Sequence, residues 1–275
     1  MFHKNNSGQA LIIIVLMIAL ALTVIAASSY QLTVQTEGSK LQEESVRALA
    51  AADAGIEAGL QIANTNAPPQ GYTFASQGLS LPGIDSEKSE IFVTDTSSAE
   101  FVSSLVLKDD QFTFYTMQPP TFPAPAFAGN LDLYFASEGA GSCSGARSVP
   151  ALELTFIYGA NNDMERRVVE PCGSGEVISG SSLTNATGVT EVIQGSTYYF
   201  RSDTINTSTF SNLKMIIVRS LFANTRIGFR ALSGTFPNQG KNIEARAYSI
   251  SGPSKIVTIF QSLPQIPADF FVTSF

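Results

Sequence analysis

The feature that most constrains this chain is a long uncharged stretch close to its first residue. Between Lys4 and Glu37 there is no Asp, Glu, Lys or Arg, and within that gap residues 10–27 carry a single polar side chain, Thr23. As a helix, this stretch would extend for about 27 Å, close to the hydrocarbon thickness of a bilayer. The sequence therefore predicts one membrane-spanning helix, with the rest of the chain folded on one side of it.

Two ordinary interpretations of such a segment stay open. A cleaved secretory signal would have a short basic leader and a small-residue cleavage site near Ala26, Ala27 and Ser28, although a secretory apolar region is about 7–15 residues and this one is longer. An uncleaved signal anchor is the second. In either case Lys4 favours a cytoplasmic N-terminus, which sends the C-terminal body out of the cytoplasm.

A third interpretation comes from the order of residues before the apolar run, where Ser7 and Gly8 are followed directly by Gln9. This layout resembles the class III leader of type IV pilins and pseudopilins, whose peptidase cuts after a glycine on the cytoplasmic side and methylates the new N-terminus. The resemblance implies a leader at residues 1–8, a cut between Gly8 and Gln9, and a methylated Gln9. The apolar segment would then stay attached after processing.

The alanine-rich segment ALAAADAGIEAGL at residues 48–60 extends this resemblance. It is similar to the N-terminal region of the PilX family of minor pilins, with Asp53 where that family usually has glutamate. Leader, anchor and extension together cover about the first 63 residues. Major pilins also carry a glutamate at the fifth mature position, which here is Ile13, so the resemblance implies a minor subunit rather than the repeating shaft subunit.

The resemblance also implies partners and a location. The expected partners are the lipid bilayer, other pilin-like subunits packed along the N-terminal helix, and the prepilin peptidase. The expected location is the bacterial cytoplasmic membrane, with the head outside and possible incorporation into an extracellular pilus. The implied role is assembly initiation, a place at the filament tip, adhesion or uptake.

We expect one helix over residues 9–64, with the transmembrane part at about 10–30. Beyond the bilayer, Ala52, Ile56, Leu60 and Ala63 recur at steps of three and four, which predicts one packing stripe that Leu41 begins two turns earlier. The small residues allow close approach of the chain's own head, of a neighbouring helix, or of both.

Charged residues on this helix give two further expectations. Glu43 and Arg47 are spaced for an i,i+4 ion pair. Asp53 and Glu57 are like charges at the same spacing, so we predict a Lys or Arg near them from the head or from a neighbouring subunit.

Residues 65–275 are predicted to form a mainly antiparallel β head, which makes the fold class α+β. Segments such as LDLYFA, ALELTFIY and IEARAYSI alternate apolar and polar residues, with Gly, Ser, Asn or Pro between them. The proline-rich residues 118–130 are expected to form a loop within a composite head, with an interdomain linker as the alternative. Residues of about 130–180 are a possible submodule, and residues 262–275 are expected to dock as a final extended strand.

Two cysteines, Cys143 and Cys172, lie in that possible submodule. In an oxidising compartment we expect them to form a disulfide, worth roughly 3–4 kcal/mol by the chain-entropy argument. Their spacing differs from a CxxC redox motif, and two thiols without histidine make a poor zinc site.

Composition argues against several classes of function. The net charge is −7, from 16 basic and 23 acidic residues, which disfavours binding through phosphate neutralisation. The single histidine is His3, so imidazole-based catalysis and histidine zinc sites lack support, as do nucleotide-binding and nucleophile-elbow motifs. We expect no enzyme activity, cofactor or metal. Residues 161–163 fit a turn better than a calcium loop.

Two questions about the head stay open. The stretch of residues 179–209, with Tyr198, Tyr199 and Phe200, is expected to be an exposed β face with its loops, and a sugar- or surface-binding patch is the alternative. The whole protein could also be a single-pass cell-surface binding protein that never polymerises.

Overall fold

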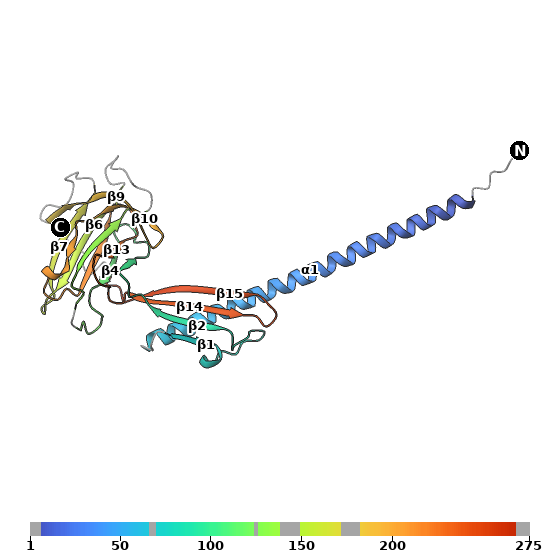
Figure 1. The fold of residues 1–275 in the computed structure, drawn as a ribbon, viewed down its shortest axis with the longest axis horizontal. Helices are drawn as coiled ribbons and strands as arrows, with labels where there is room; N and C mark the ends of the chain where they lie inside the picture. Colours follow the sequence, from blue (N-terminus) through green and yellow to red (C-terminus); the bar gives the residue numbers. More distant parts are fainter. Residues whose placement is uncertain (1–6, 66–69, 124–125, 138–148, 172–181, 268–275) are drawn as a thin grey trace. The chain divides into compact units, whose positions relative to one another are not determined.

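The computed structural model describes residues 7–65, 70–123, 126–137, 149–171 and 182–267, with side chains described from residue 14 in the helix and from residue 186 in the last segment. One long helix, α1 (Ser7–Asn64), is followed by fifteen strands within these residues (Figure 1). The chain divides into two compact units: Met1–Phe92 with Ile243–Ile259, and Val93–Asn242 with Phe260–Phe275. The α+β prediction is confirmed.

The first unit consists of α1 and a four-stranded sheet. The sheet order is β1-β2-β14-β15, and η1 (Ala75–Gln77) is a short 3-10 turn after the first strand. The strand bounds are β1 (Gln70–Thr73), β2 (Glu90–Asp95), β14 (Gly240–Tyr248) and β15 (Ser254–Ser262). β2 and β14 pair although about 145 residues lie between the end of β2 and the start of β14. Most of this intervening chain forms the second unit as an insertion.

The C-terminal half of α1 packs on this sheet through its small residues. Its buried positions fall at steps of three and four: Ala48, Ala51, Ala52, Gly55, Ile56, Gly59, Ile62 and Ala63. A β-carbon at Gly55 would lie 2.7 Å from the Phe74 ring, and one at Gly59 would collide with Ile243 of β14. Both glycines are therefore required by the close approach of helix and sheet.

The predicted stripe is largely right. Ala52, Ile56 and Ala63 are buried, and Leu60 is half-buried at the margin of the contact. Leu41 is 55% exposed, so the prediction that the packed face begins there is wrong. The sheet reaches only to Glu44, whose carboxylate accepts a hydrogen bond from Ser251 in the β14–β15 turn.

The second unit is a β-sandwich. Its first sheet has the order β3-β13-β5-β10-β9 with β11 paired to β5, and its second has the order β4-β12-β6-β7-β8. The first sheet comprises β3 (Glu100–Val102), β5 (Asn130–Phe135), β9 (Thr187–Ile193), β10 (Ser196–Arg201), β11 (Ile205–Asn206) and β13 (Gly228–Ala231). The second comprises β4 (Gln111–Tyr115), β6 (Ala151–Tyr158), β7 (Asp163–Glu170), β8 (Ser182–Asn185) and β12 (Met215–Leu221), with the 3-10 turn η2 (Thr207–Thr209) outside both. The β7–β8 pair is parallel.

The core of the sandwich is filled by alternate residues of the two sheets. Leu131, Leu133 and Phe135 of β5 are buried in the same cluster as Phe112 and Phe114 of β4. Across the interface the rings of Phe114 and Phe229 stack with centroids 3.9 Å apart and planes 9° from parallel. Such alternation is what places one face of each sheet inside a sandwich.

Residues 118–171 contribute to both sheets of the sandwich and to the loop that joins β4 to β5. Within the possible submodule at about 130–180, the described strands are divided between the two sheets, with β5 in one and β6 and β7 in the other. The proline-rich segment after β4 is a loop inside the sandwich unit that leads to β5, as expected.

The aromatic run in β10 is not an exposed face. Tyr198 is fully buried and Phe200 is 5% exposed. The register shifts between these two residues, so that Tyr198 packs with Tyr134 and Ile193 while Phe200 enters the sandwich core. A β-bulge of this kind turns residues two apart to opposite faces.

The chain past β15 packs against β4, an edge strand. The Tyr115 hydroxyl donates to the Pro264 carbonyl at 2.5 Å, and the Thr113 amide donates to Gln265 Oε1 at 2.6 Å. Leu263 and Ile266 pack on the cluster that contains Tyr115. The expected docking is therefore present for residues 263–266, where it covers an otherwise open strand edge.

Candidate anchor and packing helix

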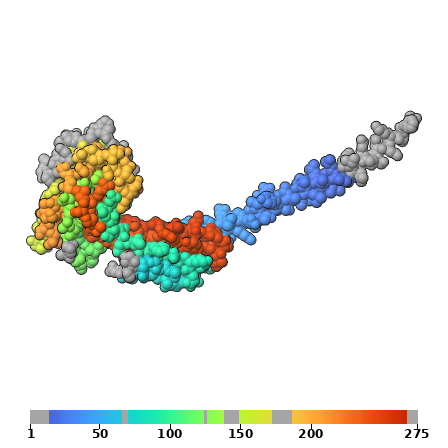
Figure 2. Space-filling view, in the orientation of Figure 1, coloured from blue at the N-terminus to red at the C-terminus, as the bar shows by residue number. Residues whose placement is uncertain are grey.

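The N-terminal half of α1 is bare. Its large apolar side chains between Ile14 and Ile25 are 54–68% exposed, and those of Tyr30, Leu32 and Val34 are 49–74% exposed. Figure 2 shows this blue part of the helix with no other segment lying on the visible face. By length and composition, α1 is the one helix among the described residues that could cross a membrane.

Leaving this surface in water is unfavourable. Full burial of a large aliphatic side chain contributes about 1.5–3 kcal/mol. The nine such side chains from Ile14 to Ile25 are each roughly half exposed, so their transfer to an apolar phase is favourable by on the order of 10 kcal/mol. The side chains of this segment therefore favour an apolar environment that its own chain does not supply.

The polar groups in the same segment are satisfied locally. The Thr23 hydroxyl donates to the Leu20 carbonyl at 2.8 Å, and the Ser28 hydroxyl donates to the Val24 carbonyl at 2.9 Å. Because an unpaired hydroxyl in hydrocarbon is costly, these bonds make the segment compatible with a bilayer.

A second exposed segment follows, from Ser28 to Glu43. It extends for about 24 Å at the usual helical rise. The helix runs through Gly38 without a break, and a β-carbon there would meet nothing within 4 Å. Thr33 and Thr36 bond back to the carbonyls of Ser29 and Leu32. Residues 31–43 of this stretch lie beyond the predicted span and before the sheet, so neither the bilayer nor the chain's own sheet covers them.

The charged residues of the packed half point away from the sheet. Asp53 and Glu57 are both exposed, next to the buried Ala52 and Ile56. Within the described chain neither carboxylate forms an ion pair, so the predicted cation is not found on the same chain and remains a prediction for a neighbouring subunit. The predicted Glu43–Arg47 pair is confirmed, with Arg47 Nη2 and Glu43 Oε1 2.7 Å apart.

The processing and disulfide predictions are not tested by the fold. Helical backbone begins at Ser7, so Gly8 and Gln9 lie in the first turn of α1. Cys143 and Cys172 lie outside the described residues. In the part of the chain that the structure describes, no group of three His, Cys, Asp or Glu side chains could hold a metal ion.

Comparison of the chain with protein-family models, with curated proteins and with solved structures found no match.

Proposed function

We propose that the chain is a membrane-anchored subunit, similar to minor pilins, whose N-terminal helix packs among the helices of neighbouring subunits in a filament. The β-sandwich would then be the part displayed outside the membrane. Cleavage after Gly8 and methylation of Gln9 belong to this proposal, as does an initiating or tip position.

The observation that carries the proposal is the extent of bare helix. A bilayer needs about 20 apolar residues, which residues 10–30 supply. Tyr30, Leu32 and Val34 lie at or beyond the end of that span, and each is at least 49% exposed. Neighbouring helices would cover them, whereas a simple anchor gives them no partner.

The packed half of α1 supports the same proposal in a second way. Its inner face is occupied by the chain's own sheet, while Val46 and Leu49 on other faces are 62% and 44% exposed. Asp53 and Glu57 are also exposed in this region, so their carboxylates are available to a cation of another subunit.

A single-pass surface protein that does not polymerise is the second candidate. The observation in its favour is that the sheet of the same chain already buries one face of residues 48–63. In that case the helix needs only lipid, and residues 28–43 would be in contact with water.

Site-specific photo-crosslinking separates the two candidates. A photoreactive amino acid replaces Val34 in the full-length chain, which is expressed in its native host with the assembly machinery present. Ile256 of β15 is the matched control, since it is also β-branched, apolar and 57% exposed but lies on the sheet.

The filament proposal predicts crosslinks from position 34 to the helix of another subunit, and few from position 256. Crosslinking from position 34 to lipid alone, or to nothing, would favour the single-pass anchor.

A further inference from the structure

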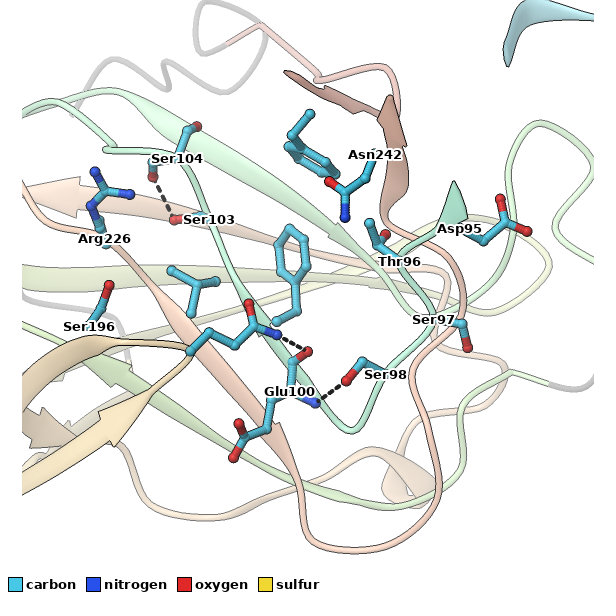
Figure 3. Close-up of a pocket in the computed structure, with 14 residues that line it drawn as sticks. Asp95, Thr96, Ser97, Ser98, Glu100, Ser103, Ser104, Ser196, Arg226 and Asn242 are labelled. Carbon is cyan, nitrogen blue, oxygen red and sulfur yellow. Dashed lines mark hydrogen bonds between the residues drawn. The ribbon is translucent and has the colours of Figure 1, made fainter. Parts of the chain in front are cut away.

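The sandwich unit contains a polar cleft of about 530 Å³ beside the edge strand β3. In Figure 3, Asn242 and Thr96 lie at one end of it and Ser196 and Arg226 at the other. The lining combines hydroxyl, amide, carboxylate and guanidinium groups with the apolar side chains of Phe101, Val102 and Phe260. A lining of this kind suits a ligand that presents both hydrogen-bonding groups and an apolar face.

Several lining groups are held in place by bonds within the chain. Ser98 Oγ accepts the Glu100 amide at 3.2 Å, and Gln194 Nε2 donates to the Glu100 carbonyl at 2.8 Å. Ser103 Oγ donates to the Ser104 carbonyl at 2.7 Å and accepts the Ile227 amide at 2.9 Å. Hydrogen bonds within the chain therefore fix the side chains of Ser98, Gln194 and Ser103.

Other groups in the cleft keep free bonding capacity. The side-chain amide of Asn242 is exposed and forms no hydrogen bond among the described residues. Gln194 uses only its amide nitrogen, which leaves Oε1 as an acceptor. Asp95 accepts from Asn238 through Oδ1 at 2.9 Å, which leaves Oδ2. Donors and acceptors are thus both available at the same surface.

The main chain of β3 adds one more donor and acceptor. Phe101 and Ser103 face β13, with the Ser103 amide bonded to the Ile227 carbonyl. By the alternation of an antiparallel ladder, the N–H and C=O of Val102 then point to the open edge. Because Gln194 already occupies the Glu100 carbonyl, the free edge offers the main chain of a single residue. That is too short for a strand of another peptide to add to the sheet.

One end of the cleft has an unfilled polar group beneath it. The Tyr198 hydroxyl lies beside Ser196 and Arg226, both of which line the cleft. It is fully buried, and no group in the described part of the chain gives it a hydrogen bond. Because this hydroxyl has no exposed surface, a ligand in the cleft does not reach it.

We propose that this cleft binds a neutral saccharide of one or two rings. Each sugar hydroxyl both donates and accepts, which matches the mixture offered by Asn242, Gln194 and Asp95. Phe260 is 38% exposed and rests against Phe101, with ring centroids 5.9 Å apart, so it presents an apolar ring to the flat side of a sugar.

Charge selects against anionic ligands. Asp95, Glu100 and Arg226 give the lining a formal charge of −1. The Glu100 carboxylate is already held by Arg230, with Oε1 and Nε 2.8 Å apart. The lining therefore offers no net positive charge to a phosphorylated or sulfated sugar. The inference does not rest on polymerisation, because no lining residue belongs to α1. All of them belong to the second unit, which includes the ends of β2, β14 and β15 that carry Asp95, Asn242 and Phe260.

The test is a binding screen with full-length protein in detergent. The probes are maltose, cellobiose, lactose and N,N′-diacetylchitobiose, with a sulfated heparin disaccharide as the anionic comparison, followed by calorimetric titration of the tightest binder. Loss of one hydrogen bond predicts that Asn242→Ala weakens binding by about fivefold. We expect Phe260→Leu, which keeps an apolar group but removes the ring, to weaken it as well.

Two matched controls show whether the effect is local. Ile256→Ala removes an exposed apolar side chain from the same strand as Phe260, and Thr190→Ala removes an exposed hydroxyl from β9; both are expected to leave the affinity unchanged. The proposal is overturned if none of the neutral sugars binds, if the heparin disaccharide binds more tightly than they do, or if Asn242→Ala and Phe260→Leu leave the affinity intact. A short peptide that competes for the cleft would also overturn it in favour of peptide binding.

Discussion

The contact between α1 and its sheet makes a sharp prediction at Gly59. An added β-carbon would collide with Cγ2 of Ile243 and lie 3.1 Å from Cγ2 of Ile91. Both neighbours are fully buried and β-branched, so neither can rotate the methyl group away. Overpacking of this kind costs about 1–3 kcal/mol, whereas Gly→Ala in a helix contributes about 0.5–1 kcal/mol of stabilisation. The overpacking cost exceeds the helix-propensity gain, so Gly59→Ala should destabilise the contact between α1 and the sheet by about 1–2 kcal/mol.

Gly38→Ala is the matched control. It lies in the same helix, but its new β-carbon would meet nothing within 4 Å. Only the helix-propensity gain then applies, so this variant should stabilise its own stretch of helix by up to about 1 kcal/mol.

Amide hydrogen exchange on the full-length protein in detergent measures both effects locally. Gly59→Ala should lower the protection of residues 48–63 by a factor of roughly 5–30, while Gly38→Ala should leave that segment unchanged. Combining Gly59→Ala with Ile243→Ala should cost less than the sum of the two single variants, because the second change removes the colliding methyl group. Unchanged or increased protection in Gly59→Ala would refute the close contact between α1 and β14.

Three further predictions concern titratable groups of the sheet and the sandwich. Burial raises the pKa of Tyr198 to about 12. The contribution of Tyr198 to stability is therefore full below pH 10 and is lost as the pH rises from 10 towards 12. The denaturant midpoint should fall less steeply over that pH range in Tyr198→Phe than in the unmodified protein. Tyr115→Phe removes the hydrogen bond to Pro264, and should cost about 1 kcal/mol and speed proteolysis after residue 262; an unchanged cleavage rate would show that this bond does not hold the segment. The pKa of Asp85 is lowered, first by the Lys88 backbone amide and then by the Lys88 side chain, so its contribution to stability is present above about pH 4 and lost as the pH falls through the lowered pKa. Carbon-detected NMR should place the titration midpoint of Asp85 below 3.8, and a midpoint at or above that value would contradict these two contacts with Lys88.

The helix could be predicted well from the sequence because its signals are local. The apolar run, the helix-ending prolines after Asn64 and the small-residue stripe all act over a few turns of one element. The end of the packed face could not be read in the same way. Leu41 is in phase with the stripe, but the sheet stops at Glu44, and that limit is set by the distant β14–β15 turn.

Many strands could also be located from alternation, as in ALELTFIY of β6 and IEARAYSI of β14. Their assignment to sheets could not, because pairs such as β2 with β14 join segments far apart in the chain. The side on which Tyr198 and Phe200 lie depends on a bulge in β10, which leaves no trace in a period-two pattern.

The cleft in the sandwich was missed for a related reason. Asp95, Gln194, Asn242 and Phe260 come from four separate parts of the chain, and none belongs to a local motif. The sugar- or surface-binding patch that the sequence left open at residues 179–209 contributes Gln194 and Ser196, but nothing in the sequence linked that stretch to the other lining residues. Topology alone brings these residues together.

Intact mass and terminal sequencing of the mature protein, recovered from membranes of its native host, test the central claim that the bare half of α1 stays attached to the head. The account predicts a chain that begins at a methylated Gln9 and still carries the whole of residues 10–27. A chain that begins near Ser28, released from the membrane, would contradict it.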